Sequence, residues 1–114
     1  MPYQAVILTV SDSCAAGTRT DTSGPAIRAM LENAGFAVQA MQTVPDEEGQ
    51  ISAAIVHACD ILQADLVVTT GGTGLSPRDV TPEATLAVLD REIRAIPVAM
   101  WVEGLKSTPR AMLS

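Results

Sequence analysis

The hydrophobic pattern along the chain alternates between short apolar runs and longer stretches with helical spacing. Residues 5–10 and 66–70 are continuous apolar runs rich in β-branched side chains, and both predict buried strands. Residues 36–44 alternate more weakly and predict another strand. The run at 66–70 is typical of a strand covered by helices on both faces, and the run at 5–10 predicts a central strand.

Between and after these runs, apolar residues recur at the i, i+3, i+4, i+7 spacing of half-buried helices. The first helix is predicted to have Ser23 as its N-cap and Gly35 just beyond its C-terminus. A second opens at Asp46, and a third is predicted over residues 81–94. After a break at residues 96–97, the spacing predicts a fourth helix, whose Trp101 is expected to pack in the core or between subunits.

Strands that alternate with helices in this order predict a three-layer α/β/α fold with a mostly parallel sheet. A chain of 114 residues fits one domain with a single core, so we interpret residues 1–114 as one domain. Ligands of such sheets bind beyond the carboxyl ends of the strands. Ser11, Asp12 and Asp46 follow such ends, which makes them candidate site residues.

The stretch at residues 69–85, TTGGTGLSPRDVTPEAT, carries the clearest candidate chemistry. Three glycines in its first half allow positive φ and can turn several backbone N–H groups toward one anion, such as a phosphate. These glycines are Gly71, Gly72 and Gly74. Thr73 and Ser76 add candidate hydroxyl donors beside them.

The second half of this stretch predicts a helix N-terminus, with its partial positive charge, next to the glycines. Thr81 is the predicted N-cap and Pro82 fits the first helical position. Arg78 offers a guanidinium for phosphate oxygens, and Asp79 offers a carboxylate for a metal ion. The stretch lacks the Gly-Lys-Ser/Thr of a Walker A loop, and Pro77 stands where the dinucleotide fingerprint needs glycine.

Each of these residues also has a structural interpretation. The glycines can form a tight strand-to-helix turn, and Arg78 can pair with a carboxylate. Asp79 can brace the loop, Asp46 can cap its helix while also binding metal, and Asp12 can stabilise the turn after the first strand.

Charge and composition exclude several other classes. The net charge of −6 argues against a nucleic-acid surface, which needs clustered Lys and Arg, but one nucleotide can still be held locally. No run is long enough to cross a membrane and the first residues lack signal-peptide features, so we expect a cytoplasmic protein. Two cysteines do not make a disulfide framework: Cys59 is expected in the core and Cys14 at the surface. His57 is interpreted as structural or solvated.

The patterns T-x-G-G-T-G at residues 69–74 and R-D-x-T-P-E-A at 78–84 are similar to the signature of the molybdopterin adenylyltransferases of molybdenum-cofactor biosynthesis. The resemblance extends over nearly the whole chain, from residues 5–12 to 106–114. It implies that MgATP adenylylates the terminal phosphate of molybdopterin and that pyrophosphate is released. It also implies a homotrimer and handover of the product to a molybdenum-insertion protein.

The same resemblance assigns roles to individual residues. Asp46 and Asp79 would be the essential carboxylates that hold Mg²⁺. The glycine loop, Arg78, Ser11 and Asp12 would line the nucleotide or pterin pocket, and Ser76, Ser107 and Ser114 would contact the substrate. Because joining two phosphates is mostly alignment and charge neutralisation, a metal held by carboxylates from two strand ends suits the reaction.

Two other functions are compatible with this resemblance, and the sequence differs from the family in one respect. A binding module of the same fold could hold molybdopterin without turnover or act in the later insertion step, and a structural protein could keep the fold alone.

Members of the family continue with another strand and an Asn-x-Pro-Gly-x-Pro loop that helps close the site. This sequence lacks that segment, so we expect it to be a fragment or to have an exposed apolar sheet edge.

Overall fold

The computed structural model describes residues 2–113 and contains three strands and five α-helices. The strands are β1 (Gln4–Val10), β2 (Ala37–Val44) and β3 (Leu66–Thr70). The helices are α1 (Asp12–Ala15), α2 (Ser23–Asn33), α3 (Glu48–Val56), α4 (Thr81–Leu86) and α5 (Ala95–Leu105). A π-helical turn at His57–Ile61 extends α3, and a 3₁₀ turn at Pro109–Leu113 follows α5.

The three strands form one parallel sheet in the order β2-β1-β3. Val10 pairs with Val44 and Thr9 with Thr70, so all three strands end at the same edge of the sheet. The predicted central position of residues 5–10 is confirmed, since β1 lies between β2 and β3 and all six residues are buried. The prediction that helices cover both faces of residues 66–70 completely is wrong. These residues are only half-buried, and β3 is an outer strand of the described sheet.

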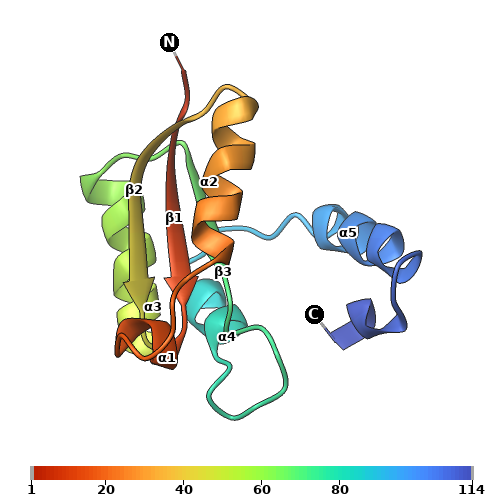
Figure 1. Cartoon of the computed structure of the whole chain (residues 1–114). Coiled ribbons are helices and arrows are strands. Elements are labelled where there is room, and N and C mark those ends of the chain that lie inside the picture. The colour runs from red at the N-terminus through yellow and green to blue at the C-terminus, as the bar shows by residue number, and fades with distance from the viewer. Residues whose placement is uncertain (1, 114) are drawn as a thin grey trace.

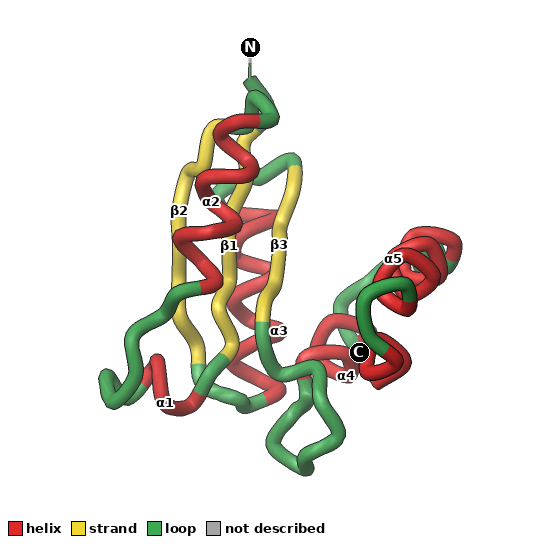
Figure 2. The backbone as a smooth tube through the Cα atoms, turned by 45° about the vertical axis from the view of Figure 1, so that its right-hand side comes forward, coloured by secondary structure: helices red, strands yellow, loops and turns green. Residues whose placement is uncertain are grey.

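Helices cover both faces of the sheet, which confirms the three-layer prediction. Figures 1 and 2 show α2 on one face and α3 on the other. The connection β1-α2-β2 runs toward one side of the sheet, and the connection β2-α3-β3 runs back past β1 in the opposite direction. Right-handed crossovers in opposite directions place their helices on opposite faces.

The core lies between the sheet and α3. Val6, Leu8 and Val10 alternate along β1 and pack against Ile51 and Ile55 of α3. This alternation follows from the two-residue repeat of a strand, and the α3 residues follow the spacing predicted from the sequence.

The predicted helix over residues 81–94 is too long. The helix α4 ends at Leu86, and residues 89–96 are all exposed. Helices in proteins are held mainly by tertiary packing of an apolar face, and beyond Val88 the segment leaves the core. The next helix, α5, begins earlier than predicted and includes Pro97, whose missing N–H has no helical partner to lose in a first turn.

The predicted helix starts and one core residue also need correction. Ser23 and Thr81 are the first residues of their helices and not the N-caps, and α3 begins two residues after Asp46. Cys59 is exposed on the π-helical turn and does not belong to the core. Sequence spacing places residues on a helix face, but it does not fix where that helix meets the sheet.

The helix α5 lies apart from the sheet and packs mainly against the turn that follows it (Figure 1). None of its described residues is buried, and Trp101 is 41% exposed, so the predicted packing of Trp101 in the core is wrong. The alternative, packing between subunits, stays a prediction. Among residues 2–113, no helix combines the length and apolar character that a bilayer crossing requires.

Candidate functional site

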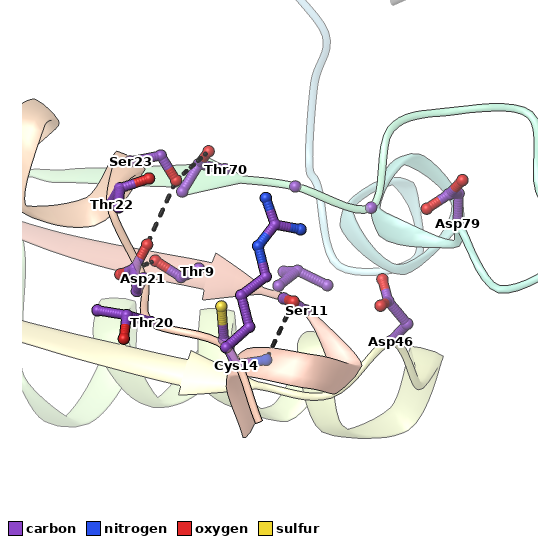
Figure 3. A pocket seen from close by; sticks show the side chains of 14 residues that line it. Thr9, Ser11, Cys14, Thr20, Asp21, Thr22, Ser23, Asp46, Thr70 and Asp79 are labelled. Carbon is purple, nitrogen blue, oxygen red and sulfur yellow. Dashed lines mark hydrogen bonds between the residues drawn. The ribbon is translucent and has the colours of Figure 1, made fainter. Parts of the chain in front are cut away.

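The carboxyl ends of the strands surround a pocket of about 310 Å³ (Figure 3). It lies where β1 and β3 meet, which is the point where the order of the sheet reverses and where parallel sheets bind their ligands. The lining residues come from the ends of β1 and β3, from the segments that follow each of the three strands, and from the start of α2: Thr9, Val10, Ser11, Cys14, Arg19, Thr20, Asp21, Thr22, Ser23, Asp46, Thr70, Gly71, Gly72 and Asp79. The predicted position of the site therefore coincides with a polar pocket.

The glycine loop leaves β3 with two consecutive residues at positive φ, Gly71 at +92° and Gly72 at +66°. Gly74 does not have positive φ, so the prediction was wrong for this third glycine. Thr81 secures the turn, because its Oγ1 donates to the carbonyl of Gly71 and its N–H donates to the carbonyl of Gly72, both at 3.0 Å. Within residues 2–113, the N–H groups of Gly72, Thr73 and Gly74 have no hydrogen-bond acceptor. Three donors are thus free for an anion.

Asp46 follows β2 and holds the first turn after β1 in place. Its Oδ2 accepts a hydrogen bond from the N–H of Asp12 at 3.1 Å, and its own N–H donates to Oδ1 of Asp12 at 3.0 Å. Its other oxygen, Oδ1, is buried and has no hydrogen-bond partner. A Cβ added to Gly72 would lie 3.0 Å from this Oδ1, so only a glycine backbone fits there comfortably. The unpartnered oxygen is available for a cation.

Asp79 braces the glycine loop and also lines the pocket. Its Oδ2 accepts from the N–H of Ser76 at 3.2 Å, and its N–H donates to the carbonyl of Ser76 at 2.9 Å. Figure 3 shows the carboxylates of Asp46 and Asp79 at one end of the pocket and that of Asp21 at the other. The two predicted metal ligands therefore share one end of the pocket, although their segments are far apart in the sequence.

Arg78 is bound to Asp12 through two hydrogen bonds. Its Nε lies 3.0 Å from Oδ2 of Asp12 and its Nη2 lies 2.8 Å from Oδ1. Neither residue lines the pocket. This pairing is the structural alternative expected for Arg78, and its contact with substrate phosphate stays a prediction. The guanidinium hydrogen bonds, with help from the N–H of Asp46, hold the pKa of Asp12 below its ordinary value of 3.8.

We expect Arg78→Gln to raise the pKa of Asp12 toward its ordinary value, because the charge-assisted hydrogen bonds to the carboxylate disappear. A lowered pKa stabilises the folded state above the ordinary value of 3.8, and this stabilisation is lost as the pH falls through the lowered pKa. An NMR titration of the Asp12 carboxyl measures the change, with Arg28→Gln as the control that leaves it in place. An unchanged pKa in Arg78→Gln would contradict the assigned cause.

The other end of the pocket contains a polar network that the sequence interpretation missed. Oδ2 of Asp21 accepts from Oγ1 of Thr9 at 2.9 Å, and its Oδ1 accepts from the N–H of Gly24 at 3.1 Å and from Oγ of Ser23 at 3.4 Å. Burial acts to raise the pKa of Asp21, but these hydrogen bonds together hold it below the ordinary value. Asp21 thus satisfies the helix N-terminus in place of Ser23. The sequence feature that could have predicted this network is an aspartate two residues before the Ser-Gly-Pro with which α2 begins.

The remaining predicted site residues lie outside the pocket. Thr73, Gly74, Ser76 and Ser107 are exposed and do not line it. Ser107 follows α5, the helix that lies apart from the sheet (Figure 1). Ser114 lies outside the described residues. Their contacts with substrate therefore stay predictions.

Comparison with known proteins identifies the family. Residues 6–114 match the family model described as "Probable molybdopterin binding domain". The chain is 40% identical over 110 residues to the molybdopterin adenylyltransferase of Haemophilus influenzae, covering 95% of this chain and 56% of that protein. It is 38% identical over 109 residues to the molybdenum cofactor synthesis protein cinnamon of Drosophila melanogaster, covering 95% of this chain and 18% of that protein.

Solved structures agree with this assignment. The molybdopterin biosynthesis enzyme MoaB of Thermus thermophilus superposes with a TM-score of 0.91 at 46% identity, over 98% of this chain and 70% of that one. The chain spans less than two thirds of the curated relatives compared above. Sequence and fold agree, and the chain belongs to the molybdopterin-binding domain family of molybdenum-cofactor biosynthesis.

Proposed function

We propose that this pocket is the site of a molybdopterin adenylyltransferase, which transfers AMP from ATP to the terminal phosphate of molybdopterin. The observation that supports the proposal best is the buried, unpartnered Oδ1 of Asp46, which lies next to Gly72 of the glycine loop. A buried carboxylate oxygen without a partner is costly in a folded protein unless a cation or donor completes it. Relatives that carry the name molybdopterin adenylyltransferase support the choice of reaction.

The residues present fit a magnesium ion. Mg²⁺ prefers oxygen ligands and commonly binds through one or two carboxylates together with substrate phosphates. Asp46 and Asp79 would hold it, and when bound it would neutralise the charge of the phosphates. Among residues 2–113, no group of three or more His, Cys, Asp and Glu side chains could hold a metal alone, so substrate oxygens would have to complete the coordination.

The residues of the chain align the two substrates and shield their charge. A bond forms between a terminal phosphate oxygen of molybdopterin and the α-phosphorus of ATP, while the bond to the bridging oxygen breaks and pyrophosphate leaves with the electron pair. The free amide of Gly72 at the pocket, and those of Thr73 and Gly74 in the loop just outside its lining, would hold a neighbouring phosphate. No side chain has to act as a base, because the attacking phosphate is already mostly ionised at neutral pH.

The test is release of pyrophosphate by the purified protein when it is given ATP, Mg²⁺ and molybdopterin. We expect release that depends on all three components, together with formation of adenylylated molybdopterin. Tight binding of molybdopterin without any release would contradict the proposal and favour a carrier or a molybdenum-insertion role.

We also expect a homotrimer that acts in the cytoplasm and passes its product to a molybdenum-insertion protein. Sedimentation of the purified protein measures the first of these expectations. The exposed apolar side chains of α5 are consistent with an assembly.

A further inference from the structure

The pocket is short of positive charge for the substrates that it is proposed to bind. Three carboxylates line it, from Asp21, Asp46 and Asp79, and Arg19 is the only Lys, Arg or His among its described lining residues. ATP and molybdopterin both bring phosphate groups into this space. A magnesium ion at Asp46 and Asp79 would balance one end, so a phosphate farther from that pair needs another cation.

Arg19 is held between two anchored residues of the loop after α1. Thr18 binds the carbonyl of Ser13 through both its N–H, at 3.0 Å, and its Oγ1, at 3.1 Å. Two residues after Arg19, Asp21 is fixed by its hydrogen bonds to Thr9 and Gly24. The backbone around Arg19 is therefore tied to the site on both sides, so that binding a ligand has to order only the exposed Arg19 side chain.

The guanidinium of Arg19 is also uncommitted. Within residues 2–113, Arg28, Arg78, Arg94 and Lys106 all form ion pairs. Arg19, Arg91 and Arg110 form neither an ion pair nor a hydrogen bond through their side chains, and of these three only Arg19 lines the pocket. Arg78, the arginine that the sequence pattern favours, is already occupied by Asp12. A pocket arginine without a carboxylate partner can offer its planar fork of donors to phosphate oxygens.

We propose that Arg19 binds a phosphate group of the substrate and is the phosphate-binding arginine of this pocket in place of Arg78. The identity of the substrate in this inference rests on the proposed function. The binding of a phosphate group by Arg19 does not depend on it. The phosphate can belong to the triphosphate of ATP or to molybdopterin, and the two sources can be told apart by kinetics.

The first experiment measures the dissociation constant of inorganic pyrophosphate by calorimetry for the wild type, Arg19→Ala and Arg19→Lys. Arg28→Ala is the matched control, since Arg28 lies on α2, pairs with Glu32 and does not line the pocket. We expect Arg19→Ala to weaken binding by about 10- to 100-fold, the worth of one or two charge-assisted hydrogen bonds. Arg19→Lys should recover part of the loss because it keeps the charge without the fork.

The second experiment compares KM values for pyrophosphate release. A rise confined to ATP assigns the Arg19 contact to the triphosphate, and a rise confined to molybdopterin assigns it to the pterin phosphate. Pyrophosphate affinity in Arg19→Ala equal to that of the wild type, or an equal loss in Arg28→Ala, overturns the inference. If Arg19 controls pyrophosphate affinity but the wild type never adenylylates molybdopterin, the anion site stands and the proposed function falls.

Discussion

Asp46→Asn is expected to slow pyrophosphate release by about 100- to 1,000-fold, the loss typical of removing one preorganised electrostatic group. The amide is nearly the same size as the carboxylate, and its oxygen can still accept the hydrogen bond from the N–H of Asp12. It carries no charge, however, and the buried position of Oδ1 would receive a neutral group. Metal binding should therefore fail while the fold is kept.

The measurement is a steady-state assay of pyrophosphate release with a check of thermal unfolding for each variant. Glu48→Gln is the matched control, because it removes one negative charge from the exposed first turn of α3, two residues away and outside the pocket. Binding of molybdopterin should survive in Asp46→Asn. Turnover within a few-fold of the wild type would show that the unpartnered oxygen has no role in the reaction.

Gly71→Ala is expected to destabilise the protein by about 2–4 kcal/mol, from backbone strain together with overpacking. Gly71 has φ of +92°, a conformation that side chains with a Cβ rarely adopt. A Cβ there would also overlap the carbonyl oxygen of Val10 at the end of β1. Both strands end at this contact, so the backbone cannot move aside without disturbing the sheet edge that forms the pocket.

Urea denaturation measures the change, and Gly35→Ala separates its two causes. Gly35 follows α2 with φ of +96°, nearly the same conformation, but a Cβ added there would meet no atom within 4 Å. We expect a loss of only about 1 kcal/mol at Gly35, from the left-handed conformation alone. Equal losses at the two positions would mean that the close approach of Gly71 to Val10 does not matter for stability.

Local patterns explain why much of this protein could be predicted. The alternation and β-branched character of residues 5–10 predict the buried central strand, and consecutive glycines after residues 66–70 predict the turn with positive φ. In a parallel sheet the residues after each strand gather at one edge. Asp46 and the glycine loop could therefore be placed together before their contacts were known.

The sequence by itself determined the order of strands and helices, the position of the pocket at the strand ends and the family signature, because these depend on neighbouring residues. The tertiary structure decided how the charged groups pair. Arg78 meets Asp12 across 66 residues of sequence, and that contact leaves Arg19 as the uncommitted arginine of the pocket. The early end of α4 and the exposure of Cys59 were decided in the same way. Such pairings depend on which segments the folded sheet brings side by side. The spacing of residues within one segment of the sequence does not reveal these contacts.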